Sequence, residues 1–236
     1  MKINFTSDGY KLAGNLFVAE QPKNLALLFI QGWTGHQNIP AAEALTRLGY
    51  TTMLYDMRGN RESEGSLADF SRADFVHDAA VAYDFLRDHV GADVPIGVIG
   101  SSFGSYSAIL LSKERDIYCL SLRVPANYPD NGFNEPELNQ HRDRADYFDW
   151  CAKPLNYTQN YALAALHNYG GLVHIVEAGA DEEVAQQTPK NYADAIVDKT
   201  KLTYEVMPEA PHSLKTPDLQ ANYTKRLTTW VSRIST

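Results

Sequence analysis

Short apolar runs recur along the chain, and segments with helical spacing separate most of them. The apolar runs predict strands near residues 25–30, 51–55, 95–99, 117–122, 172–177 and 202–207. Apolar positions three and four residues apart predict helices over residues 40–48, 71–89, 105–112, 188–197 and 217–234. Because strands that alternate with helices build α/β folds, the pattern predicts a mostly parallel central sheet with helices on both faces.

The amino-terminal segment follows a different pattern. Polar and apolar positions alternate over residues 2–6 and 11–18, on either side of the turn-forming sequence Ser7-Asp8-Gly9. An Asp-Gly step between alternating segments is a strong hairpin signal. We therefore expect an antiparallel pair of strands at the start of the fold.

The pentapeptide Gly100-Ser101-Ser102-Phe103-Gly104 stands between the apolar run at 95–99 and the helical segment at 105–112. A G-x-S-x-G turn between a strand and a helix is typical of a nucleophile elbow, which holds the serine hydroxyl out at the carboxyl end of a sheet. We predict that Ser102 is a nucleophile and that the backbone N–H of Phe103 helps to bind an oxyanion. Taken alone, the pentapeptide also fits a loop of small residues packed under a helix.

Two later strands lead to an acid and to a histidine. The run at 172–177 is followed by Asp181, and the run at 202–207 is followed by His212. An imidazole can accept the proton of a serine hydroxyl, and a buried carboxylate orients that imidazole. We predict a catalytic set of Ser102, His212 and Asp181, with Glu182 and Glu183 as competing acids.

The loop Gln31-Gly32-Trp33-Thr34-Gly35-His36 follows the first parallel strand expected from the pattern. A glycine-containing loop at this place can offer a second backbone N–H to an oxyanion, and Trp33 is the residue we predict for it. His36 stands near this loop, and contact with a substrate is one hypothesis for it.

Together these segments resemble the α/β-hydrolase superfamily over nearly the whole chain, and its serine-esterase-like members in the dienelactone hydrolase and acyl-peptidase branch. Residues Asp56, Arg58-Gly59, Ser63 and Gly65 are similar to that family's D-x-R-G-x-G-x-S-x-G loop, and residues 178–184 to its acid turn. Four positions depart from the family pattern: Gln31 replaces a histidine, Asn60-Arg61 replaces His-Gly, and Ala178 replaces a glycine. The resemblance implies an α/β-hydrolase fold.

Residues 127–168 interrupt the alternation with turn formers, charges and aromatic residues. Because this stretch lies between two strands, we predict a cap over the carboxyl ends of the sheet, with a surface excursion of solvated helices as the alternative. Tyr147, Phe148 and Trp150 are the cap side chains expected to reach a substrate. Arg123, at a strand end, has two interpretations: it binds a substrate carboxylate or forms an internal salt bridge.

Composition and charge narrow the class of protein. The 236 residues are 44% hydrophobic and 21% charged, which fits one soluble domain over residues 1–236. The 29 acids and 21 bases give a net charge of −8, so nucleic acids and anionic membranes are unfavourable partners. The expected partner is a small-molecule ester or acyl compound, and the oligomeric state is left open.

The cysteines and the amino terminus favour the cytoplasm. Cys119 and Cys151 lie in such different settings that no disulfide framework is indicated, and Cys119 is expected to be a small buried apolar residue. The first residues lack the apolar core of a signal peptide, and no apolar run approaches the ~20 residues of a membrane span.

The motifs favour serine chemistry without a cofactor. The sequence has no H-E-x-x-H, no C-x-x-C and no dinucleotide or P-loop pattern, so neither a metal nor another cofactor is expected. We predict a serine hydrolase that cleaves a carboxylic ester through an acyl-enzyme. The alternatives are a peptidase, amidase or thioesterase with the same three residues, or a ligand-binding member of the fold without turnover.

Overall fold

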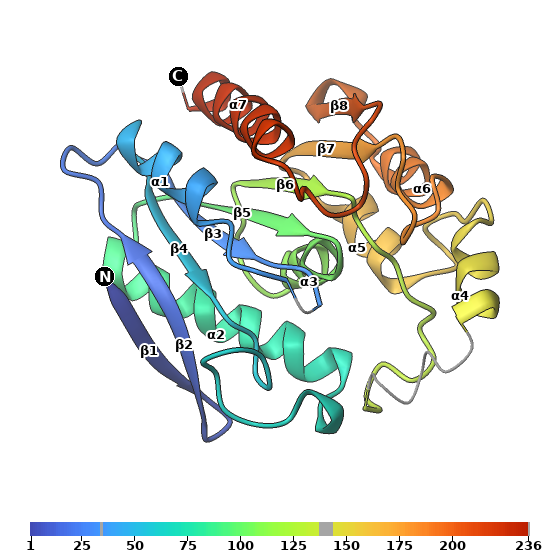
Figure 1. The fold of residues 1–236 in the computed structure, drawn as a ribbon, viewed down its shortest axis with the longest axis horizontal. Coiled ribbons are helices and arrows are strands. Elements are labelled where there is room, and N and C mark those ends of the chain that lie inside the picture. Colours follow the sequence, from blue (N-terminus) through green and yellow to red (C-terminus); the bar gives the residue numbers. More distant parts are fainter. Residues whose placement is uncertain (34, 137–143, 236) are drawn as a thin grey trace.

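The computed structural model describes residues 1–33, 35–136 and 144–235 (Figure 1). Thr34 of the expected oxyanion loop and residues 137–143 of the expected cap therefore lie outside the described residues. The strands form one eight-stranded sheet in the order β1-β2-β4-β3-β5-β6-β7-β8. Strands β3 to β8 pair with one another in parallel, which confirms the predicted mostly parallel sheet. Their bounds are Ala26–Ile30 (β3), Thr51–Tyr55 (β4), Ile96–Ser101 (β5), Cys119–Arg123 (β6), Leu172–Ala178 (β7) and Leu202–Met207 (β8).

The predicted hairpin is present at the edge of the sheet. Strands β1 (Lys2–Ser7) and β2 (Tyr10–Phe17) pair antiparallel, with Ser7 opposite Tyr10. Asp8 and Gly9 between them have φ values of 48° and 86°. Positive φ at both central residues is what a tight hairpin turn requires, and Asp-Gly tolerates it. β2 also pairs antiparallel with β4, which joins the hairpin to the parallel sheet.

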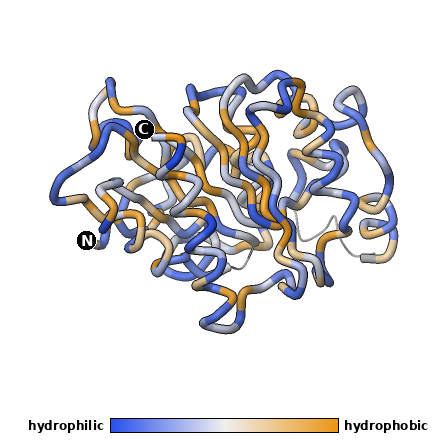
Figure 2. Tube along the Cα trace, turned by 90° about the horizontal axis from the view of Figure 1, so that it is seen from above, coloured by the Kyte–Doolittle hydropathy of each residue, from blue (hydrophilic) through white to orange (hydrophobic). Residues whose placement is uncertain are grey.

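Helices cover both faces of the sheet, as the alternation predicts. One face carries α1 (Ile39–Arg47) and α7 (Pro217–Ile234), and the other carries α2 (Arg72–Val90), α3 (Phe103–Leu111), α5 (Tyr161–Asn168) and α6 (Gln187–Ala195). Within β3, Leu28 packs in one core and Leu27 in the other. The central strands are therefore mostly apolar, and they form the hydrophobic centre in Figure 2. No helix in the described ranges is long and apolar enough to span a membrane.

The segment expected to be a cap is mostly part of the fold itself. Its helix α5 connects β6 to β7, and the side chains of Ala162, Leu163 and Leu166 are buried in the core shared with α3 and α6. Its other helix, α4 (Arg144–Cys151), lies near α6, where the hydroxyl of Thr188 donates to the carbonyl of Cys151 at 3.2 Å. The β-α alternation thus continues through this stretch, with α4 as the added element.

Both cysteines are buried and free, as expected for Cys119. Burial raises the pKa of the Cys119 thiol to about 12 and that of Cys151 to about 11. Since only the thiolate is nucleophilic, both side chains are unreactive at neutral pH.

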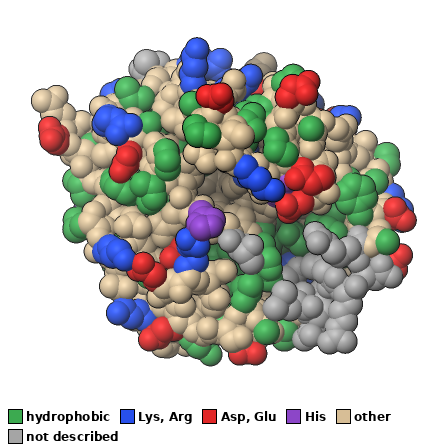
Figure 3. Space-filling view, viewed as in Figure 1, with side chains coloured by type: hydrophobic (Ala, Val, Ile, Leu, Met, Phe, Trp, Pro, Cys, Tyr) green, Lys and Arg blue, Asp and Glu red, His purple; other side chains and the backbone are tan. Residues whose placement is uncertain are grey.

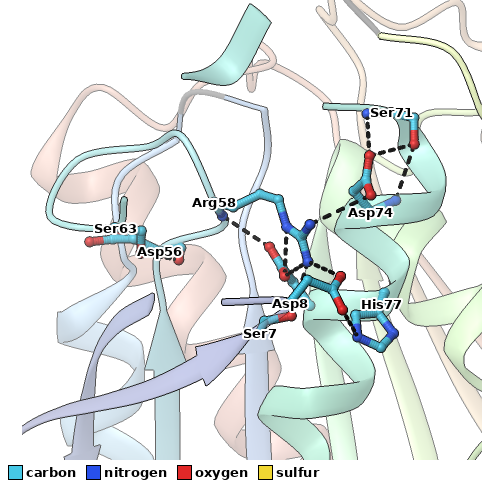
Figure 4. Close-up of polar contacts among 9 residues, drawn as sticks. Ser7, Asp8, Asp56, Arg58, Ser63, Ser71, Asp74 and His77 are labelled. Atoms are coloured by element: carbon cyan, nitrogen blue, oxygen red, sulfur yellow. Dashed lines mark hydrogen bonds and ion pairs between the residues drawn. The ribbon is translucent and has the colours of Figure 1, made fainter. Parts of the chain in front are cut away.

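The loop after β4 is fastened by a buried arginine. The Arg58 side chain is 2% exposed and donates to Asp78 at 2.6 and 2.9 Å and to Asp8 at 3.0 Å. Asp74 lies 3.5 Å away, and Figure 4 shows the guanidinium pointing into this group of acids. Ser63 in the same loop binds backbone only, donating to the carbonyl of Asp56. Arg58 thus fastens this loop to the hairpin and to α2.

A close approach between backbones fixes the turn before α3. A Cβ on Gly104 would lie 2.1 Å from the carbonyl oxygen of Ile30, and a Cβ on Gly100 would lie 2.5 Å from Cα of Ser105. These contacts are with backbone atoms, which cannot rotate away. The two glycines of the pentapeptide are thus required by packing.

We predict that Gly104→Ala lowers the free energy of unfolding by about 3 kcal/mol, because β3 and α3 must separate to admit the methyl group. Gly170→Ala is the matched control. No atom lies within 4 Å of the Cβ it would add, and its φ is not positive, so stability should be unchanged or slightly higher. Urea unfolding of the two variants measures the difference. Equal stabilities would contradict this packing argument.

We predict that Asp78→Ala costs about 3–5 kcal/mol of stability, because it leaves the buried Arg58 without its main partner. Arg115→Met is the control, since it removes an exposed pair with Asp84 and should cost at most about 1 kcal/mol. Urea unfolding compares the two. A smaller loss for Asp78→Ala than for the control would show that the Arg58 group does not hold the loop.

Candidate active site

Ser102 occupies a strained turn at the carboxyl end of β5. Its φ of 54° and ψ of −120° lie in a region that non-glycine residues rarely adopt. Neighbouring backbone groups hold it there: its N–H donates to the carbonyl of Arg123 at 2.9 Å, and its carbonyl accepts from Ser105 at 2.9 Å and Ala126 at 3.3 Å. The geometry is that of the elbow expected from the pentapeptide.

The structure brings Ser102, His212 and Asp181 together. Nε2 of His212 lies 3.0 Å from Oγ of Ser102, and Nδ1 lies 2.9 Å from Oδ2 of Asp181. An ionised carboxylate only accepts hydrogen bonds, so the Nδ1 proton faces Asp181 and the Nε2 lone pair faces the serine hydroxyl. The carboxylate is itself fixed, because its Oδ1 accepts from the backbone N–H groups of Glu183 at 2.9 Å and Val184 at 2.8 Å.

The two competing acids have other positions. Oε2 of Glu182 accepts from the backbone N–H of His212 at 3.1 Å, and this bond holds the pKa of Glu182 below its ordinary value. Oε2 of Glu183 lies 3.8 Å from Nε2 of His212, on a side chain that is half exposed. Asp181 is thus the carboxylate that contacts Nδ1, and its side chain is 5% exposed.

The predicted oxyanion donors lie on the two segments that flank the serine. Phe103 is the first residue of α3, and a Cβ on Gly32 of the β3–α1 loop would lie 3.2 Å from Cβ of Ser102. The Trp33 ring packs edge-on against Phe103 and Phe75, with centroids 5.2 Å apart in both pairs. Within the described ranges, the backbone N–H groups of Trp33 and Phe103 have no hydrogen-bond acceptor.

Gln31 anchors the base of the oxyanion loop, a role that sequence reasoning missed. Its side-chain amide donates to the carbonyl of Tyr55 and to Oδ1 of Asp56, the latter at 3.1 Å. Gln37 donates to the same Asp56 oxygen at 3.0 Å. The two amides tie the loop to the end of β4. The sequence signal for this role was that Gln31 stands where the family that the chain resembles carries a histidine.

A cavity of about 580 Å³ opens beside Ser102, which is within the range of small-molecule sites. It lies between the β3–α1 loop and the segment from His212 into α7, and Figure 3 shows the hollow on this face. His36, one of the residues considered for substrate contact, is part of its wall. The lining also includes Trp33, Ser101, Arg123, Glu183, Leu214, Lys215, Gln220 and Tyr223.

The three aromatic residues of the expected cap lie elsewhere. Tyr147 stacks on Tyr128 with centroids 5.5 Å apart, and its hydroxyl donates to the carbonyl of Asn127 at 2.8 Å. Phe148 is 40% exposed. Neither of these residues nor Trp150 lines the cavity beside Ser102. Because α4 lies near α6 at the side of the sheet, the structure does not bring this group to the site.

Arg123 lies in the site but forms no internal salt bridge within the described chain, so that interpretation was wrong. Its guanidinium donates to the carbonyl of His212 at 2.8 Å and to Oγ of Ser101 at 2.5 Å. Its Cζ lies 5.7 Å from the ring centre of Tyr223. Burial lowers the pKa of Arg123, and the charges of Tyr223 and Asp181 oppose that effect. Arg123 thus joins the histidine loop to the serine turn.

A second group of a serine, a histidine and an acid lies within the sheet. Nδ1 of His174 is 3.2 Å from Oγ of Ser121, and Nε2 is 3.3 Å from Glu205. Ser121 and His174 are fully buried, away from the cavity, and burial lowers the pKa of His174 to about 4. This set is structural. The described residues contain no cluster of histidine, cysteine or acids that could hold a metal ion.

Comparison with solved structures shows the same fold in several hydrolases. Est1E from Butyrivibrio proteoclasticus, solved with ferulic acid bound, is 20% identical with a TM-score of 0.75, and 98% of each chain is covered. An α/β serine hydrolase homologue from Coxiella burnetii is 17% identical with a TM-score of 0.69, covering 97% of this chain and 96% of that chain. The esterase Pf2001 from Pyrococcus furiosus is 20% identical with a TM-score of 0.70, covering 99% and 92%.

A comparison with curated proteins found no match. A family model described as alpha/beta hydrolase fold matches residues 26–150, which are more than half of the chain and include the serine turn. The match identifies the superfamily without distinguishing its branches, so the branch stays a prediction. From its sheet, its serine turn and this match, the chain belongs to the α/β-hydrolase fold family.

Proposed function

We propose that this protein is a serine hydrolase that cleaves a carboxylic ester through an acyl-enzyme intermediate. The observation that supports it most is the continuous hydrogen-bonded chain from Ser102 through His212 to Asp181. A serine hydroxyl is a weak nucleophile until a base accepts its proton. Here the base is within hydrogen-bond distance and already oriented, and a cavity large enough for a small ester adjoins it.

In the proposed acylation, Oγ of Ser102 attacks the ester carbonyl carbon while Nε2 of His212 takes the hydroxyl proton. The carbonyl oxygen becomes an oxyanion, and Asp181 stabilises the imidazolium that forms. Collapse of this intermediate breaks the bond to the alcohol, which leaves with the proton from His212. Water then attacks the acyl-enzyme with His212 again as base, which releases the acid and restores Ser102.

The oxyanion in this mechanism is bound by the backbone N–H groups of Trp33 and Phe103. Fixed donors of this kind stabilise the transition state because they need no reorganisation when charge develops. The Trp33 ring, packed against Phe103 and Phe75, holds the loop that carries the first donor. The second donor is at the start of α3, where the helix dipole is positive.

The choice of an ester follows from the solved structures that share the fold. Est1E has ferulic acid bound in its structure, and Pf2001 is named as an esterase. These similarities are at 20% identity, so they support the proposal by analogy of fold only. The same triad can also cleave amides and thioesters, since the pocket rather than the triad selects the leaving group.

We predict that Ser102→Ala folds normally and loses ester hydrolysis by about four to six orders of magnitude. A fluorophosphonate probe should label the parent protein at Ser102 and should not label the variant. Ser112→Ala, at the other end of α3, is the control and should be labelled like the parent. A panel of matched nitrophenyl esters, anilides and thioesters then ranks the leaving groups. Labelling of Ser102→Ala would remove the proposed nucleophile.

We predict that Asp181→Asn lowers kcat by about 10⁴-fold, because the imidazole loses the partner that fixes its tautomer. Glu182→Gln and Glu183→Gln are the matched controls on adjacent positions, and each should change kcat by less than about tenfold, since neither carboxylate contacts Nδ1. Steady-state kinetics on one nitrophenyl ester compares the three variants. A larger loss in either glutamate variant would move the orienting role away from Asp181.

A further inference from the structure

The cavity beside Ser102 carries two cations that lack a carboxylate partner. Arg123 and Lys215 both line it, and neither forms an ion pair anywhere in the described ranges. Arg123 is the more informative of the two, because its side chain is half-buried at the end of β6 and is held there by hydrogen bonds.

The buried arginines of this chain differ in their partners: Arg72 donates to the carbonyls of Pro129 and Asn131, whereas Arg58 is paired with acids. Its guanidinium is surrounded by the carboxylates of Asp8, Asp74 and Asp78. Arg123, by contrast, donates only to two neutral oxygens, the carbonyl of His212 and the hydroxyl of Ser101. A guanidinium has five N–H donors, so three remain beyond these two bonds, on a side chain that lines the cavity. A carboxylate is the group that matches such a donor set most closely.

The rim adds to the positive character. Lys215 is exposed on the segment between His212 and α7, and its ammonium has no acceptor among the described residues. On the other side of the opening, Nδ1 of His36 lies 2.6 Å from Nη2 of Arg61. Because a guanidinium only donates hydrogen bonds, Nδ1 is the acceptor and Nε2 carries the proton of the neutral ring. Figure 3 shows basic and histidine side chains beside the hollow.

Two acids near the cavity would repel a bound anion, and this repulsion limits the negative charge that the anion can carry. Glu183 lines the rim on a half-exposed side chain, where water screens it. Asp181 is already engaged with His212 and two backbone N–H groups. A singly charged carboxylate meets less repulsion from these acids than a doubly charged phosphate does, because the repulsion grows with the charge.

We propose that the cavity selects esters that carry a carboxylate in addition to the bond that is cleaved, and that Arg123 and Lys215 bind this carboxylate. The proposal rests on the proposed function, because it names the class of substrate that Ser102 attacks. Arg123 has a second role as a positioning residue, since it also holds the carbonyl of His212. No hydrogen bond joins Lys215 to Ser102 or His212 among the described residues, so its variants test the charge.

The test compares matched esters that differ by one charge. The carboxylate is placed on the leaving group in one pair, 4-acetoxybenzoate against 4-acetoxybenzamide, and on the acyl group in the other, mono-4-nitrophenyl adipate against 4-nitrophenyl adipamate. The readout is the ratio of kcat/KM for the charged ester to that for the neutral ester. Comparing this ratio between variants cancels the intrinsic reactivity of each ester.

In at least one pair the parent protein should prefer the charged ester by about tenfold. Lys215→Gln should lower the ratio about threefold and Lys215→Glu about tenfold. Arg123→Gln should lower both rates, because the histidine loop loosens, and should lower the ratio by a further tenfold or so. Lys113→Gln, beyond the far end of α3, is the control and should leave the ratio unchanged.

A binding measurement separates this proposal from the proposed function. Calorimetry on Ser102→Ala should detect binding of adipate or benzoate, weakened in Lys215→Glu, and weaker or no binding of adipamide and benzamide. If Ser102 is not labelled by fluorophosphonate and no ester is cleaved, the proposed function fails, and calorimetry alone decides whether the carboxylate site exists. If neutral esters are cleaved but neither pair shows a preference for charge, the carboxylate site is refuted and the hydrolase stands.

Discussion

The site depends on the close approach of the serine turn to β3. Gly104 lies so near the carbonyl of Ile30 that no side chain fits, and this contact sets the distance between α3 and the β3–α1 loop. The turn costs free energy, because Ser102 has a φ of 54°, and strained residues of this kind cost about 1–3 kcal/mol. The backbone bonds of Ser102 to Arg123 and Ala126 offset that cost. The β3–α1 loop and Ser102 are consequently adjacent.

Arg58 and Arg123 both lie near the carboxyl ends of the strands, and they have different partners. Arg58 is neutralised by acids, and its cluster fixes a loop outside the cavity. Arg123 is held by neutral oxygens and lines the cavity itself. A carboxylate bound in the cavity would offset the cost of burying this charge, as the proposal above requires. The contrast within one chain underlies the proposed preference for charged esters.

The placement of the cavity follows from the helix layers. Its wall includes residues of α1 and α7, and it lies between the β3–α1 loop and the segment that carries His212. The segment with the aromatic residues runs on the other face, where α5 completes the connection from β6 to β7. Its Tyr147 therefore packs in the core beside Tyr128, while the residues that line the cavity belong to short loops and to the first turns of α1 and α7.

The sequence by itself determined the sheet, most helix boundaries to within about two residues, the hairpin and the serine turn. These features depend on local periodicity and on residues close together in the chain, as with helix α7 over residues 217–234 or the pair Asp8-Gly9. It also indicated Ser102 and His212, because the ends of parallel strands converge at one edge of a sheet.

Only the tertiary structure decided among Asp181, Glu182 and Glu183, since three adjacent carboxylates differ in direction and not in chemistry. It also decided the partners of Arg123, which contacts a carbonyl 89 positions away in the chain, and the face on which the cavity opens. The tertiary structure also decided that Tyr147, Phe148 and Trp150 lie away from that cavity. Such contacts join distant segments, so their geometry depends on how the layers pack, and no local pattern of residues records it.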